Sequence, residues 1–441
     1  MQTRSHKLRG RLLRLAHLVG CFCCLHLARG QNQLSLTPGD VVLRPESASQ
    51  ETLAESASQA SLRFAGLDIF PRAAVTAMYD DNLLIAANHP LSDVEWTISP
   101  GLTIAAGDLS LSLSGRVTLA DIRDLLTYSL LDDSSRPQRY VGVDYSPALN
   151  FFTDHSQYNN VDQIAGLSAG YAFSRLAIGL DQDFWSGNVK NNEVSGLIDE
   201  TVVNTRLRFQ YGLTDRSNAE ITGQYRSLAY ADRRYQGYQE FHNEAFYNRL
   251  WGARLQVGLG AAFGFVNPEG SPDQTYQQAL VRGLYVVSGK LDLRGNVGIE
   301  FRQYDSGQAG TVAPVFNFSA TYQPRVSTTF TVEAHRQEEP SFGGDYNYVT
   351  LGFSAGARQQ LLGRLTAMLN AGYDNVDYAR LNSGISNDRA DNYYLVRASL
   401  QYDINRHLAT TLFWNHRQYA SNIQGYSYVD NLVGVRLNWY Y

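Results

Sequence analysis

Charged side chains occupy one side of several segments in which every second residue is polar. In segment 291–302, for example, Asp292, Arg294, Glu300 and Arg302 alternate with apolar residues. Guanidinium and carboxylate groups on one face can guide a polar solute through a lumen, or they can pair with one another and stiffen a wall. Both interpretations stay open here. The candidate lumen-facing set is Arg206, Arg208, Asp292, Arg294, Glu300, Arg302, Arg364, Arg397 and Arg436.

Residue spacing gives little support to catalytic, cofactor or metal chemistry. Gly258, Gly260 and Gly264 miss the dinucleotide-binding spacing and are interpreted as strand glycines. The nine histidines show no metal-ligand spacing, and no Ser, His and Asp set stands out as a triad. We therefore predict that the protein is not an enzyme, and we expect no cofactor and no metal.

The elements that carry these charges are predicted to be strands. Apolar residues recur with period two, as Val297, Ile299 and Phe301 do on the face opposite Glu300 and Arg302. Each alternating run is about ten residues long, which is the length that a tilted strand needs to cross a membrane. The pattern predicts an all-β fold, a transmembrane antiparallel up-and-down β-barrel in a single domain. A soluble β-sandwich or propeller also alternates, but its strands are usually shorter.

Connections between the runs alternate between short and long. Short turns such as Thr214-Asp215 are separated by longer polar stretches such as 377–391. Outer-membrane barrels have short periplasmic turns and long outer loops, so this alternation favours that class. The count is 20 strands if Tyr140–Tyr145 and Leu149–His155 form a hairpin around Ser146-Pro147, and 18 if this stretch is an extracellular excursion. An alternating run at 109–119 is among the predicted strands.

The first thirty residues have the layout of a cleaved secretory signal peptide. Basic residues precede a mainly apolar stretch that ends at Ala28-Arg29-Gly30. Leu18-Val19-Gly20-Cys21 also resembles a lipobox, so lipoprotein processing is the alternative. Residues 31–66, rich in Ser, Ala, Glu and Gln, are predicted to form a flexible periplasmic extension. Residues 67–441 are predicted to form the barrel.

Removal of the leader would change the chemistry of the chain. All three cysteines lie in it, so the mature chain would have no thiol for redox or metal chemistry. Six basic residues and no acid would be lost, which moves the formal net charge from −5 to about −11. Such an acidic chain is not expected to bind nucleic acid. Lys190 and Lys290 would be the remaining lysines, which favours bidentate arginine pairing over a loose cationic surface.

The chain ends in aromatic residues that are predicted to direct assembly. Leu437, Trp439 and Tyr441 fall on one face of the last run. We expect them to face outer-membrane lipid and to form part of the signal that the barrel-assembly machinery reads. Aromatic clusters elsewhere, such as those in 235–251 and at Tyr393-Tyr394, are expected mostly in the interfacial girdles. Stacking on sugar rings is the alternative for these clusters.

Several short motifs resemble the putative β-barrel porin family 2. They are Tyr79-Asp80-Asp81-Asn82, Ser92-Asp93, Ile98-Ser99-Pro100-Gly101-Leu102, Asp144-Tyr145-Ser146 and the terminal Leu437-Asn438-Trp439-Tyr440-Tyr441. The resemblance would cover about residues 67–441 and departs at Tyr441, where the family more often has phenylalanine. It implies an outer-membrane barrel. By association with exopolysaccharide secretion systems, it also implies polysaccharide export.

The expected function is therefore an outer-membrane channel that serves as a conduit for exported polysaccharide. A general solute porin is one alternative, and a structural or adhesive surface barrel with a closed lumen is another, because one fold can host all three. The expected partners are outer-membrane lipid, the barrel-assembly machinery and polysaccharide-export components.

Overall fold

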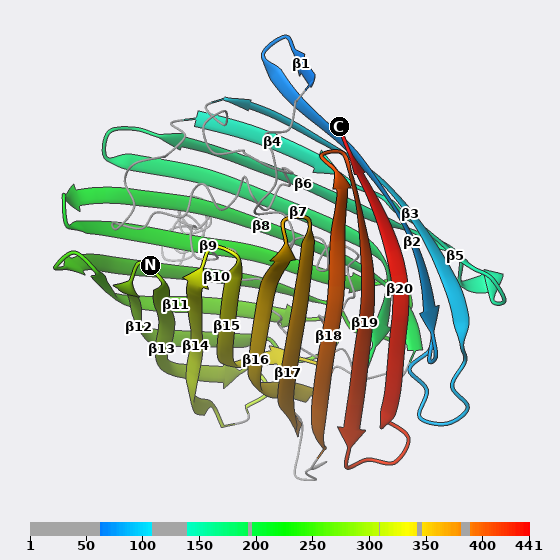
Figure 1. The fold of residues 1–441 in the computed structure, drawn as a ribbon. Coiled ribbons are helices and arrows are strands. Elements are labelled where there is room, and N and C mark those ends of the chain that lie inside the picture. The colour runs from blue at the N-terminus through cyan, green and yellow to red at the C-terminus, as the bar shows by residue number, and fades with distance from the viewer. Residues whose placement is uncertain (1–61, 108–138, 193–195, 308, 342–345, 381–388) are drawn as a thin grey trace.

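The strands pair in sequence order and return on themselves in the computed structural model, which describes residues 62–107, 139–192, 196–307, 309–341, 346–380 and 389–441 (Figure 1). β2 (Leu67–Asp80) pairs with β3 (Asp93–Gly107) on one side and with β20 (Tyr428–Tyr440) on the other. Because β2 pairs with both β3 and β20, the sheet closes on itself. Every pairing is antiparallel, so the closed sheet is an up-and-down barrel. The predicted all-β barrel is confirmed.

The remaining described strands follow in chain order. They are β4 (Arg139–Tyr145), β5 (Ala148–Phe152), β6 (Asn160–Ala172), β7 (Leu176–Asn191), β8 (Gly196–Thr214), β9 (Ser217–Tyr230), β10 (Tyr238–Trp251), β11 (Leu255–Pro268), β12 (Gln274–Ser288), β13 (Leu291–Tyr304), β14 (Thr311–Arg325), β15 (Thr328–Pro340), β16 (Tyr346–Leu362), β17 (Leu365–Arg380), β18 (Ala390–Asn405) and β19 (Leu408–Ser421). A short 3-10 helix (Ser156–Tyr158) follows β5. β1 (Leu62–Phe64) pairs with the start of β2.

β4 and β5 are two pieces of one wall strand. Both pair with β3 and β6, and one register continues across the break: Tyr145 lies opposite Leu102, and Leu149 lies opposite Ile98. Pro147 has no N–H and interrupts the ladder. Because β1 lies outside the ring and β4 and β5 count once, the described strands close an 18-stranded barrel. Neither the expected hairpin at Ser146-Pro147 nor the extracellular excursion is correct, since this stretch crosses the wall.

The barrel has two rims with different connections. The end of β20 and the start of β2 define the turn rim, near the C-terminus in Figure 1, where β12 and β13 are joined by two residues. Longer connections such as the β19–β20 loop lie at the opposite end, the loop rim. The connection from Gly107 to Arg139 also begins and ends at the turn rim. It is long, although only short turns were expected at this rim. The predicted strand at 109–119 lies outside the described residues, and β3 pairs directly with β4.

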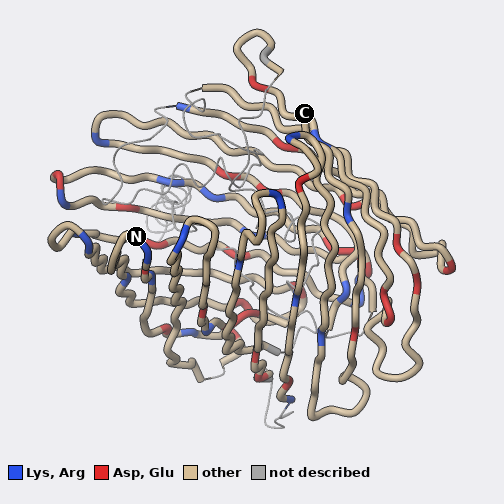
Figure 2. Tube along the Cα trace, in the orientation of Figure 1, with Lys and Arg blue, Asp and Glu red and all other residues tan. Residues whose placement is uncertain are grey.

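Alternation sorts the side chains of each strand into an apolar outer face and a polar inner face. On β13, Val297, Ile299 and Phe301 are exposed on the outside, whereas Glu300 and Arg302 are buried on the inside. Figure 2 shows basic and acidic residues intermixed along the wall. An outer face rich in apolar side chains suits a surface in contact with lipid. Among the described residues, no helix is long and apolar enough to span a membrane, which has no bearing on crossing by strands.

Candidate functional site at the inner face of the loop rim

Glu300 and Arg302 form the centre of a buried polar cluster. Arg302 Nε donates to Glu300 Oε1 at 2.8 Å, and Arg302 Nη1 donates to Gln274 Oε1 of β12 at 2.9 Å. Glu338 of β15 lies 3.6 Å from the same guanidinium, which also sits over the ring of Tyr276. The side chains of Glu300 and Arg302 are each less than 5% exposed. A buried pair of this kind is costly to break from one side, by about 3–5 kcal/mol.

Other predicted residues also meet polar partners. Arg208 pairs with Asp181 of β7 at 3.2 Å, and Ser168 Oγ donates to the second oxygen of Asp181 at 2.7 Å. Arg206 lies opposite Asp181 in the strand register. Arg436 Nε donates to Thr76 Oγ1 at 3.0 Å. Asp292, Arg294 and Arg397 lie at half-buried positions of β13 and β18, in alternation with exposed residues such as Val297 and Leu400.

Arg364 does not lie on the barrel wall. It is exposed in the β16–β17 turn and donates to the Ile404 carbonyl oxygen at 3.2 Å. The reason is that period-two alternation has no meaning once the chain leaves the strand. The residues of the predicted assembly signal, Leu437, Trp439 and Tyr441, are all exposed. Leu437 and Trp439 share the outer face of β20 with Val433 and Val435.

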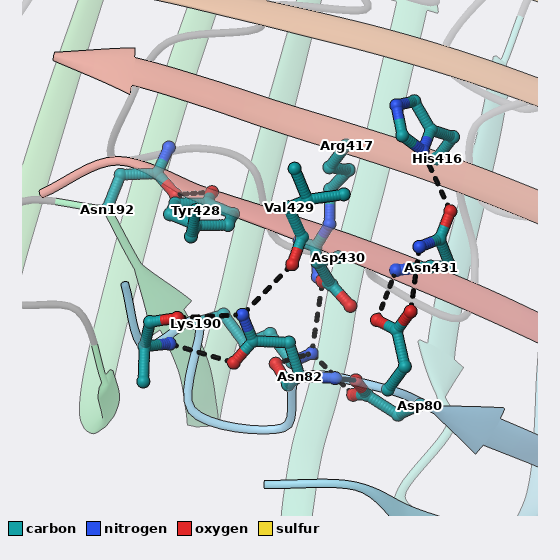
Figure 3. A network of polar contacts seen from close by, with 12 residues as sticks. Asp80, Asn82, Lys190, Asn192, His416, Arg417, Tyr428, Val429, Asp430 and Asn431 are labelled. Atoms are coloured by element: carbon teal, nitrogen blue, oxygen red, sulfur yellow. Dashed lines mark hydrogen bonds and ion pairs between the residues drawn. The ribbon is translucent and has the colours of Figure 1, made fainter. Parts of the chain in front are cut away.

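A network around Lys190 joins strands that are far apart around the barrel (Figure 3). Near the end of β7, Lys190 Nζ contacts Asp80 at the end of β2 and lies 3.2 Å from Asp430 Oδ2 on β20. It also donates to the carbonyl oxygen of Asn82 at 3.1 Å, and Arg417 of β19 pairs with the same Asp430 oxygen. The rarity of lysine marked Lys190 in the sequence, but no spacing indicated which distant strands it would meet.

Three carboxylates of this network could in principle hold a cation. Oxygens of Asp80, Asp81 and Asp430 lie within 4.8 Å of one another. Lys190 and Arg417 already bring positive charge to Asp80 and Asp430, and Asp81 accepts a hydrogen bond from Asn431 Nδ2 at 2.7 Å. The arrangement is therefore an ion-paired bridge between strands, and nothing in it calls for a metal.

The β2–β3 loop, residues 81–92, folds against the inner wall beside the Lys190 network. Ile85 is fully buried in a cluster with Tyr393, Leu395, Tyr419 and Tyr428 of β18–β20. Its φ of +48° is a left-handed conformation that β-branched residues rarely adopt. Conformations of this kind persist where surrounding contacts hold them, so burial of Ile85 anchors the loop at the mouth of the barrel.

The end of the β7–β8 hairpin is held on two sides. One side packs in a buried apolar cluster of Trp185, Val189, Ile198, Val202, Leu228, Tyr238, Val266 and Tyr276, drawn from β7 to β12. The other side reaches β20, where Asp430 pairs with Lys190 and the Tyr428 hydroxyl donates to Asn192. The hairpin end thus lies between two parts of the wall and narrows the lumen at the loop rim.

A cavity of about 230 Å³ lies on the inner face of β10–β15. Its polar lining includes Glu240, Asn296, Glu300, Arg302 and His335. Pockets for drug-sized ligands have volumes of about 300–1,000 Å³. This cavity therefore suits one small solute or one unit of a longer chain.

Aromatic residues divide between the two faces. Phe241, Tyr247, Trp251 and Tyr394 are exposed on the outside, whereas Tyr238, Phe246 and Tyr393 are buried. Two glycines of β11 make room for inner rings: a Cβ on Gly260 would lie 2.4 Å from Phe246, and one on Gly264 would lie 2.0 Å from Tyr276. The inner wall thus carries aromatic rings as well as charges.

Residues 275–440 match the family model described as Putative beta-barrel porin 2. The predicted family resemblance is confirmed over these residues, which run from β12 to β20. Most of the motifs on which we based it lie outside the match, towards the N-terminus.

No curated protein matches the chain. Three solved structures illustrate the similarity to known barrels. OpdK of Pseudomonas aeruginosa is 12% identical, with a TM-score of 0.44 and coverage of 85% of this chain and 99% of that one. OpdQ of the same organism is 12% identical, with a TM-score of 0.45 and coverage of 86% and 100%. OccAB3 of Acinetobacter baumannii is 10% identical, with a TM-score of 0.44 and coverage of 86% and 100%.

Proposed function

We propose that this porin-like β-barrel of the outer membrane is a channel for hydroxyl-rich solutes and serves in the cell as a conduit for exported polysaccharide. The observation that carries the proposal is the composition of the inner face at the loop rim. Tyrosine rings such as Tyr276, Tyr393 and Tyr428 lie there beside amides and ion-paired charges. Sugar units present both hydroxyls, which donate and accept hydrogen bonds, and ring faces that pack on aromatic side chains.

Pairing of the inner charges favours neutral solutes over ions. Arg302 is occupied by Glu300, Arg208 by Asp181, and Lys190 by Asp80 and Asp430. A lumen whose charges are matched in this way presents hydrogen-bonding groups without a strong field of either sign. A chain of neutral or weakly charged sugars would meet such a wall without a large electrostatic barrier.

A structural barrel with a closed lumen is the second candidate, because one observation favours it. The Lys190 bridge and the buried Ile85 hold the β7–β8 hairpin and the β2–β3 loop at the loop rim. If these contacts close the lumen permanently, no solute crosses. A general solute porin predicts the opposite behaviour, which is passage of any small solute according to size.

The rate at which trapped solutes leave liposomes that contain the barrel distinguishes these functions. The purified barrel is reconstituted into vesicles that contain radiolabelled maltohexaose, and efflux is compared with that of a polyethylene glycol of matched hydrodynamic size. We expect maltohexaose to leave several times faster than the glycol, because hydrogen-bonding groups of the wall favour the sugar. Equal rates would indicate a general porin, and retention of both solutes would indicate a closed structural barrel.

A further inference from the structure

The ladder between β14 and β15, which are neighbours in the wall (Figure 1), stops before the loop rim. It starts at the turn rim, and its last pair is Phe316 with Arg336. Beyond that pair, Thr311–Val315 still pairs with β13, and Gln337–Pro340 still pairs with β16. These two strand ends are therefore edges that face each other across a split in the wall. At about 3.4 Å per residue, the split is roughly 15 Å long.

The sequence itself favours a split at this place. Each strand end contains a proline, Pro314 in β14 and Pro340 in β15. Proline has no N–H to give to a ladder, so it is confined in sheets to edges, strand starts and bulges. Side chains replace part of the lost pairing: Arg336 Nη1 donates to the Pro314 carbonyl oxygen, and Arg302 Nη2 of β13 donates to the Glu338 carbonyl oxygen at 3.2 Å.

The end of β15 turns away from the regular wall. Alternation from Arg336 would place Glu338 on the outer face. Its carboxylate instead accepts hydrogen bonds on the inner side, from the Tyr304 hydroxyl at 2.8 Å and from Asn347 Nδ2 at 2.7 Å. Arg302 Nε also lies 3.6 Å from this carboxylate. Release from β14 allows this turn, because no ladder holds the end of β15 flat against its neighbour.

The cavity of about 230 Å³ lies at this split. Glu300 and His335 line it from the inner face, and Phe316 and Arg336 line it as well. Phe316 and Arg336 are in register with Val297, which is exposed on the outside, so they occupy outer-face positions. A cavity that residues of both faces line extends from the lumen side into the thickness of the wall.

The outer face is apolar at the level of the split. Pro314 lies opposite Ile299 and Val312 lies opposite Phe301, and the last three of these side chains are all exposed. Sheet edges are not left open to hydrocarbon, and irregular backbone at membrane depth is tolerated where it is buried in protein or lines a polar cavity. A polar opening thus adjoins an apolar outer surface. An amphiphile matches this arrangement, with its polar head in the opening and its chain outside.

We propose that the split between β14 and β15 is a lateral portal from the lumen to the surrounding lipid, and that it binds an amphiphile with an uncharged, hydroxyl-rich head and one alkyl chain. The head occupies the cavity, and the chain lies on the exposed side chains of β13 and β14. A phosphate or carboxylate head is disfavoured, because glutamates outnumber arginines in the cavity lining. They are Glu240, Glu300, Glu338 and Glu339 against Arg302 and Arg336. The class of head rests on the proposed function, whereas the portal does not.

Photolabelling tests the bound amphiphile. A decyl glucoside that carries a diazirine in its chain is irradiated with the barrel in phosphatidylcholine nanodiscs, and mass spectrometry locates the label. We expect saturable labelling within residues 299–316, and we expect unlabelled decyl glucoside to compete at a concentration at least tenfold lower than decyl phosphate or methyl glucoside. Labelling spread evenly over the outer surface, or equal competition by decyl phosphate, would overturn the proposal.

A matched pair of variants tests the cavity as the seat of the head. Gln337→Trp fills the cavity from the end of β15, so saturable labelling should fall at least tenfold. Ser319→Trp is the control, because Ser319 lies on the inner face of β14 opposite Glu333, in the part of the ladder that is intact. Its labelling should stay within twofold of the wild type. Wild-type labelling of folded Gln337→Trp would contradict a head group in the cavity.

Disulfide formation tests the split without any ligand. The described residues contain no cysteine, so an introduced pair reports on its own two positions. Val315 and Gln337 would be opposite each other if the ladder continued by one step, as Ser319 and Glu333 are in its intact part. We expect the Val315→Cys/Gln337→Cys pair to oxidise at least tenfold more slowly than the Ser319→Cys/Glu333→Cys pair. Equal rates would show a closed wall and overturn the portal.

The portal and the proposed channel fail separately. Sugar efflux from liposomes without labelling at the split would overturn the portal and leave the channel standing. Labelling at the split without sugar efflux would overturn the channel and leave the portal standing.

Discussion

At the residue scale, position in a strand predicts the face of a side chain but not its partner. Glu300 and Arg302 were predicted to share a polar face, and they lie together on the inner side of β13. The contact of Arg302 with Glu338 of β15 could not be read from spacing, because it depends on how the strands curve. Lys190 makes the same point more strongly, since its partners are more than a hundred residues away.

Substitution on each face of β13 tests the face assignment. Val297→Arg would place a charge on the outer face in contact with lipid, where we expect a loss of about 2–4 kcal/mol of barrel stability if the position is near mid-membrane. Arg294→Ser on the opposite face should cost less and should change ion selectivity if the lumen conducts. Urea unfolding in lipid vesicles measures both variants. Equal losses of stability would show that the faces have been assigned wrongly.

At the element scale, alternation identified most strands because the environment imposes it. A wall between lipid and lumen requires apolar and polar side chains in turn, so the sequence carries the period directly. The break at Ser146-Pro147 was misread because a proline after a serine is also typical of a turn. The inward position of the β7–β8 hairpin end was missed because alternation says nothing about where a strand leads after it leaves the membrane.

The final strand offers a test of assembly. Deletion of Trp439 through Tyr441 removes the Trp439 pairings with Ala73 of β2 and Leu408 of β19, and the Tyr440 pairing with Arg72. It also removes outward aromatic side chains at the turn rim. We expect little or no heat-modifiable barrel in the outer membrane, as judged by gel migration with and without boiling. Normal amounts of heat-modifiable protein would contradict a role for these residues in closure and assembly.

At the scale of the whole molecule, closure and the narrowed mouth decide the function. Closure follows from the pairing of β2 with β20 and was predictable from the period and the connections. The narrowed mouth was not, since it arises from Lys190, Ile85 and Trp185, which come from separate parts of the chain and meet only in the folded barrel. A sequence pattern with period two predicts the face of each side chain but not contacts between distant parts of the chain.

Single-channel conductance of a Lys190 variant tests most directly whether the lumen is a channel with a bridged mouth. Lys190→Met keeps the length of the side chain but removes the ammonium that links β7 to Asp80 and Asp430, so the hairpin end should loosen from β2 and β20. Lys290→Met, in an exposed turn at the other rim, is the matched control. We predict a clearly higher conductance or open fraction for Lys190→Met than for the wild type, and no change for Lys290→Met. Folded Lys190→Met protein with no conductance in planar bilayers would contradict the channel.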